Sequence, residues 1–146
     1  MNRQERIEEA VALFKQGFNC SQAVVAAYAD MYGFSREQAL RMAASFGGGI
    51  GKMRETCGAA CGMFILAGLE TGTVDPADKA GKAANYALVQ RLAAKFREEC
   101  GALRCADLLG LSKNGTERTP KRPCAVMVET AARIWGDYLD ERKGGL

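Results

Sequence analysis

A glycine-rich turn that runs directly into an uncharged segment places the strongest constraint on this chain. Four glycines fall within residues 47–51, and residues 57–69 contain no charged side chain. Glycine adopts positive φ at little cost and lets several backbone N–H groups point toward one ligand. An apolar run without strict alternation is typical of a helix that is buried on all sides. We therefore expect a buried central helix at approximately residues 54–71, preceded by a turn able to hold an anion.

The segments before and after this centre have helical patterns. Residues 19–22 and 35–38 have the capping-box pattern, and the Asp–Pro pair at 75–76 is typical of another helix start. No segment alternates as a strand would. The expected helices lie at residues 2–16, 20–32, 36–46, 54–71, 76–99 and 123–141, with a short helical piece at 105–109 and an exposed loop at 111–122. We predict an all-α, single-domain bundle of about six helices that spans residues 1–146.

Composition and charge exclude several classes of protein. The chain has 146 residues, of which 48% are hydrophobic, and this is enough for one domain with its own core. The net charge of +3 is spread along the chain, so no nucleic-acid partner is expected. No apolar run reaches the roughly 20 residues of a membrane-spanning helix, and the charged segment 1–9 lacks the apolar centre of a secretory signal. We therefore expect a cytoplasmic protein.

The sequence contains six cysteines and no histidine. In a reducing compartment, such a set of cysteines is more often metal-binding or redox-active than a disulfide framework. The lack of histidine excludes His-ligated haem, His-containing zinc sites and Cys–His dyads, so haem is not expected. Zinc or an iron–sulfur cluster would have to be held by thiolates.

Most of the cysteines share one position in the predicted helices. Those that fall in a first helical turn are Cys20, Cys57, Cys105 and Cys124. Free backbone N–H groups and the helix dipole favour a thiolate there. We predict Cys57 to have the most strongly lowered pKa, assisted by Lys52 or Arg54. If the helix N-termini converge, the four thiols face one cavity.

Other residues near the turn are secondary candidates. Cys61 lies one turn after Cys57 and is predicted to be a small core residue, whereas Cys100 ends a helix, where the dipole opposes a thiolate. Glu55 is expected to be a surface carboxylate that would relay a proton only if it faced the site. The candidates for binding a cofactor or anion are Gly48, Gly49, Gly51 and Arg54.

Four segments in order along the chain match the motifs of one known family. They are N-C-S-Q-A-V at 19–24, the glycine turn and C-G-A-A-C-G through residue 62, C-A-D-L-L-G at 105–110 and P-C at 123–124. On these residues, almost the whole chain resembles the family of redox-active proteins named for the CGCAxxGCC cysteine motif. The resemblance implies a thiol-centred redox role and an association with membrane transporters, near whose genes members are encoded. The family's characteristic cysteines fall on Cys20, Cys57, Cys105 and Cys124.

Three functions remain open from the sequence. In the first, these four cysteines are catalytic and carry out thiol/disulfide or electron-transfer chemistry, as in a thiol-dependent oxidoreductase. In the second, the same four thiolates hold zinc or an iron–sulfur cluster, although no compact C-x₂-C pair is present. In the third, the chain is a helical adaptor whose cysteines fill the core. The sequence does not identify a redox partner, and its apolar centre is compatible with a homodimer.

Overall fold

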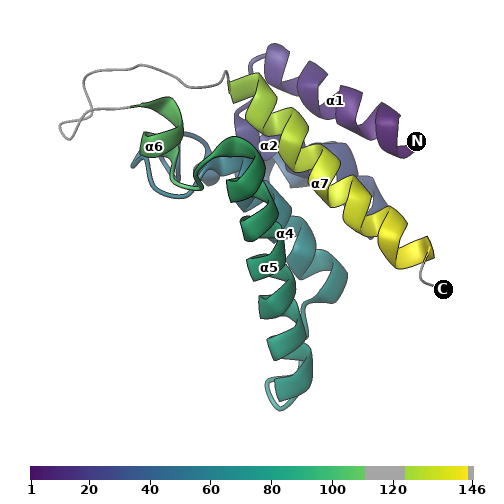
Figure 1. Ribbon diagram of the computed structural model, residues 1–146. Helices are drawn as coiled ribbons and strands as arrows, with labels where there is room; N and C mark the ends of the chain where they lie inside the picture. The colour runs from purple at the N-terminus through teal and green to yellow at the C-terminus, as the bar shows by residue number, and fades with distance from the viewer. Residues whose placement is uncertain (111–123, 145–146) are drawn as a thin grey trace.

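The computed structural model describes residues 1–110 and 124–144, and helices dominate these residues (Figure 1). The α-helices are α1 (Arg3–Lys15), α2 (Cys20–Tyr28), α3 (Arg36–Ala43), α4 (Gly58–Thr71), α5 (Lys79–Cys100), α6 (Cys105–Leu109) and α7 (Cys124–Gly144), with 3₁₀ helices at Ala29–Tyr32 and Ala44–Phe46. The predicted all-α class is confirmed, with seven α-helices in the described residues rather than about six. None of the described helices is both long and apolar enough to cross a membrane. The loop expected at 111–122 lies outside the described residues.

α2 lies at the centre of the helix packing, because it contacts α1, α3, α4 and α7. α1 and α7 lie side by side with opposite chain directions, and α2 packs against both of them (Figure 1). α4 contacts α2, α5 and α7, so the helix that was expected to be central packs on one side of α2 instead. α4 and α5 form an antiparallel pair that projects from the α1–α7 layer (Figure 1).

Both predicted capping boxes set the start of a helix. The Asn19 side chain accepts the Gln22 N–H of α2, and the Gln22 side chain accepts the Asn19 N–H. Ser35 and Gln38 make the same reciprocal pair at the start of α3. Each box satisfies backbone donors that would otherwise lack partners at the helix terminus. The first of them also fixes Cys20 as the first residue of α2.

Two helix starts differ from the predictions. α4 begins at Gly58 instead of near residue 54, because Arg54 has a φ of 62° and Cys57 is extended, with φ −51° and ψ 132°. α5 begins at Lys79 rather than after the Asp–Pro pair, because the Asp78 side chain accepts the N–H of Gly81 at 2.8 Å and caps the helix there. Residues 75–77 form a turn before this cap.

Glycines allow α4 to approach α2 closely. A Cβ at Gly58 would lie 2.5 Å from the sulfur of Cys20, and a Cβ at Gly62 would lie 2.9 Å from the Cβ of Val24. Gly58 and Gly62 are one helical turn apart, so they face the same side of α4. The two glycines of the C-G-A-A-C-G segment therefore place the N-terminal part of α4 directly against the N-terminal part of α2.

Candidate functional site

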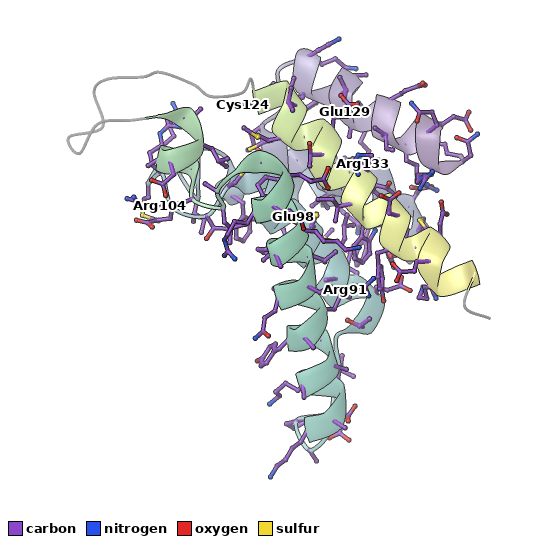
Figure 2. All side chains as sticks on the ribbon, in the orientation of Figure 1. Arg91, Glu98, Arg104, Cys124, Glu129 and Arg133 are labelled. Atoms are coloured by element: carbon purple, nitrogen blue, oxygen red, sulfur yellow. The ribbon has the colours of Figure 1, made fainter. Side chains whose placement is uncertain are left out.

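Four cysteines from separate helices line one pocket of about 140 Å³. They are Cys20, Cys57, Cys105 and Cys124, which start α2, immediately precede α4, start α6 and start α7, respectively. All four are free thiols. The rest of the lining consists of Phe14, Gly48, Arg54, Gly58, Leu108, Leu109 and Met127. The structure thus brings the four first-turn candidates to one pocket, a convergence that the sequence left open. Figure 2 shows Cys124 at the start of α7, on the side of the molecule toward α6.

The glycine-rich turn forms one wall of this pocket through an uncommon backbone. Residues 48–52 all have positive φ, between 59° and 72°, and they include the non-glycine residues Ile50 and Lys52. Each such non-glycine residue costs roughly 1–2 kcal/mol, so surrounding contacts must hold the turn in place. The N–H groups of residues 50–55 supply these contacts, because each donates to a carbonyl within residues 45–50.

This pattern corrects the expected anion-binding role of the turn. The N–H groups of residues 50–55 are used inside the turn and do not point toward a ligand. Gly51, one of the cofactor-binding candidates, donates to the Ser45 carbonyl at 2.7 Å and does not line the pocket. Gly48 does line it, and its N–H donates to the sulfur of Cys20. Gly49 packs behind Cys105, because a Cβ on Gly49 would lie 2.5 Å from the Cys105 Cβ.

Arg54 brings a guanidinium to Cys105 rather than to Cys57. One terminal nitrogen, Nη1, lies 3.7 Å from the Cys105 sulfur. The backbone fixes this approach, since the Ala106 N–H donates to the Arg54 carbonyl and the Cys57 N–H donates to the Leu103 carbonyl at 2.8 Å. Segments 54–57 and 103–106 therefore hold each other in register and keep the Arg54 guanidinium beside the Cys105 sulfur.

Burial overturns the prediction that Cys57 has a lowered pKa. Its side chain is 6% exposed, and burial raises its pKa to about 12, although the N–H groups of Ala60 and Ala59 act in the opposite direction. Burial also raises the pKa of Cys20, and the Gly48 N–H partly offsets this effect. A helix N-terminus is thus insufficient where the sulfur loses its contact with water.

The thiols of the pocket affect one another's pKa through their charges. Negative charge on Cys124 or Cys105 further raises the pKa of Cys20, and charge on Cys20 or Cys105 raises the pKa of Cys57. Charge on Cys20 likewise raises the pKa of Cys61, which lies outside the pocket, so these effects do not by themselves select a thiol pair.

The remaining candidates lie outside the pocket. Cys61 is buried, its pKa is raised to about 11 chiefly by burial, and its sulfur contacts the Thr56 carbonyl at 3.8 Å. Cys100 is part of the hydrophobic core at the end of α5. Glu55 is exposed and lies 3.7 Å from the Arg104 guanidinium, and Lys52 is also exposed. Of the two cations that were candidates to assist a thiol, Lys52 and Arg54, it is Arg54 that contacts one.

A metal centre is not preformed by these thiols. Within residues 1–110 and 124–144, no group of three or more cysteine or carboxylate side chains is placed to hold a metal ion. Structural zinc and iron–sulfur clusters require four such ligands around one point. The four cysteines share a pocket but do not present that arrangement.

The apolar part of the pocket was not predicted from the sequence. Phe14 and Met127 reach it from α1 and α7, and Leu108 and Leu109 reach it from α6. Phe14 recurs at helical spacing with Ile7 and Ala10 of the first helix. Its helical spacing signalled burial, but which neighbours it meets depends on the packing of distant segments.

Comparison with known families decides the classification. The sequence profile of the family described as "Putative redox-active protein (C_GCAxxG_C_C)" matches residues 18–138. The chain belongs to this family. The part that matches the C_GCAxxG_C_C family includes all four pocket cysteines, the glycine-rich turn and Arg54. No curated protein and no solved structure matches the chain.

Proposed function

We propose that this protein carries out thiol–disulfide exchange in the pocket formed by Cys20, Cys57, Cys105 and Cys124. The observation that carries the proposal is the gathering of four free thiols around one small pocket, with a guanidinium on one of them. Membership in a redox-active family supports the same chemistry. We further place the protein in the reducing cytoplasm, where such thiols would stay available between reactions.

Cys105 is the attacking thiol in this proposal. Negative charge moves from the attacking sulfur to the leaving sulfur in disulfide exchange, and a neighbouring guanidinium stabilises that charge. Arg54 supplies this guanidinium at 3.7 Å. Cys57 is unsuited to the first attack, because its pKa of about 12 keeps it protonated at neutral pH.

Cys20 resolves the intermediate. The Cys105 thiolate attacks a substrate disulfide, forms a mixed disulfide and releases one substrate thiolate, which takes up a proton. Cys20 then loses its proton to solvent and attacks the Cys105 sulfur, which releases the second substrate thiolate. The products are a Cys20–Cys105 disulfide and two substrate thiols, so two protein thiols are oxidised and one disulfide is reduced.

Cys57 and Cys124 act after this step. Both line the same pocket as Cys20, so either can exchange with a disulfide that contains Cys20. Exchange of this kind moves the disulfide across the pocket without consuming a further oxidant. The pocket would thus allow three alternative disulfides that share Cys20.

A thiol count with matched variants tests this function. Protein purified without oxygen is treated with one equivalent of a small disulfide, and its thiols are counted before and after. Loss of two thiols in the wild type and in Cys61→Ser, but not in Cys105→Ser, is expected. Metal and sulfide analysis of the same sample tests the two alternative functions, a metal or iron–sulfur site and a helical adaptor. Stoichiometric iron with sulfide, or zinc, would contradict dithiol chemistry, and inert thiols without metal would favour the helical adaptor.

A further inference from the structure

The size of the cysteine pocket limits what can react in it. Its volume is about 140 Å³. Pockets for drug-sized ligands usually measure about 300–1,000 Å³, and one water occupies about 30 Å³ of liquid. The pocket therefore has the space of about five waters. The disulfide group of a small molecule and part of its substituents fit such a space, whereas a nucleotide or a folded protein loop does not.

The charged groups that line the pocket also limit which substrates it can hold. Among the described residues that line it, Arg54 is the one with a charged side chain, and the others are thiols, glycines and apolar side chains. Phe14, Leu108, Leu109 and Met127 reduce the access of water to this charge. A cation with apolar surroundings attracts an anion more strongly than the same cation would in bulk water.

Among residues 1–110 and 124–144, no carboxylate neutralises the charge on Arg54. Within the described part of the chain, no aspartate or glutamate forms an ion pair with Arg54. Arg104, on the segment that pairs with residues 54–57, has Glu55 at 3.7 Å and Asp107 at 3.8 Å. A guanidinium has five N–H donors, so the Cys105 contact leaves donors of Arg54 for a ligand.

We propose that the pocket selects small disulfides that carry a negative charge, and that Arg54 determines this selection. The proposal rests on the thiol–disulfide exchange described above. A carboxylate of the substrate binds the free N–H donors of Arg54, which places the substrate disulfide against Cys105. The Cys105–substrate bond forms as the substrate S–S bond breaks, and Cys20 closes the protein disulfide with release of the second thiol. Arg54 is thus the specificity-determining residue of the pocket.

The test uses small disulfides of similar size and different charge. The probes are dithiodiglycolate, which is anionic, bis(2-hydroxyethyl) disulfide, which is neutral, and cystamine, which is cationic. Each rate of thiol loss is divided by the rate of the same probe with free 2-mercaptoethanol, which removes differences in intrinsic reactivity. The normalised rate is expected to be about tenfold higher for dithiodiglycolate than for the neutral probe, and lowest for cystamine. Oxidised glutathione, which is anionic but larger, is expected to react more slowly than dithiodiglycolate.

Variants of two arginines separate selection from general reactivity. Arg54→Gln should reduce the preference for dithiodiglycolate over the neutral probe to within about twofold, because the attracting charge is gone. Arg54→Lys keeps the charge and should keep the order of the probes. Arg104→Gln, which removes a nearby guanidinium that faces Glu55 and Asp107, should keep both the order and the rates.

The outcomes distinguish this inference from the proposed function. Equal normalised rates for the three small probes in the wild type, or an unchanged order in Arg54→Gln, would overturn the selection while leaving disulfide exchange intact. A faster reaction with oxidised glutathione would overturn the size limit. No thiol loss with any probe would overturn both the selection and the exchange.

Discussion

Cys57 and Cys105 both lie at helix starts, yet their sulfurs have different surroundings. The pKa of Cys57 rises to about 12 because burial outweighs the N–H groups of α4. Cys105 has a guanidinium 3.7 Å from its sulfur. Sequence position predicted that both residues lie near a helix start, but it left open whether they face one cavity. It did not predict which sulfur meets Arg54, because that contact depends on the pairing of segments 54–57 and 103–106.

The raised pKa of Cys57 predicts a loss of stability at high pH. Above the ordinary thiol pKa of 9.0, the unfolded chain releases the Cys57 proton and the folded chain retains it. The stability that neutral Cys57 contributes is therefore fully present below pH 9.0 and is lost as pH rises through about 12. In urea titrations from about pH 8 to about pH 10, the unfolding free energy should fall more steeply in wild type than in Cys57→Ala, by up to about 1.4 kcal/mol per pH unit above the ordinary pKa. Parallel slopes in the two proteins would show that Cys57 ionises equally in both states.

At the scale of elements, the sequence predicted helix starts where local side chains set them. The capping boxes of α2 and α3 are local, and both were predicted. The predicted start of α4 was wrong because Arg54 has positive φ. Contacts outside α4 hold this conformation: the Arg54 N–H donates to the Gly48 carbonyl, and the Arg54 carbonyl accepts the Ala106 N–H. The close packing of α4 on α2 also depends on tertiary structure, although its glycines are visible in the sequence.

This packing predicts opposite effects for two glycines of α4. Gly58→Ala places a methyl group 2.5 Å from the Cys20 sulfur and 2.6 Å from the Phe46 carbonyl oxygen. It should lower the unfolding free energy by about 1–3 kcal/mol and change the reactivity of Cys20. Gly68→Ala is the matched control, because its added methyl group would meet no neighbouring atom within 4 Å. It should raise stability by up to about 1 kcal/mol. Equal effects of the two changes in denaturant titrations would contradict the packing described for α2 and α4.

At the scale of the molecule, one cluster of buried residues joins six helices. It takes side chains from α1, α2, α4, α5, α6 and α7, and it includes Cys57 of the pocket. Its members include Leu88, Leu92 and Phe96, which recur every four residues as helical periodicity requires of a buried face, and Trp135 of α7. The pocket itself required the three-dimensional arrangement of four helix starts, which periodicity does not specify.

The shared cluster predicts that the chain unfolds as a single domain. Trp135, the one tryptophan of the sequence, is fully buried on α7 and reports on the core by fluorescence. Its transition in urea should coincide with the loss of helix measured by circular dichroism, because a single cooperative domain loses both together. Two separated transitions would contradict the single-domain assignment of residues 1–146.

The most direct test of the central claim is to identify the disulfide that forms first. Reduced protein is treated with one equivalent of dithiodiglycolate, quenched with acid and alkylated, and its disulfide-linked peptides are identified by mass spectrometry. The account predicts a Cys20–Cys105 disulfide as the first product, with a trapped Cys105–thioglycolate adduct in the Cys20→Ser variant. A first disulfide that contains Cys61 or Cys100, or oxidation of Cys105→Ser at the wild-type rate, would contradict it.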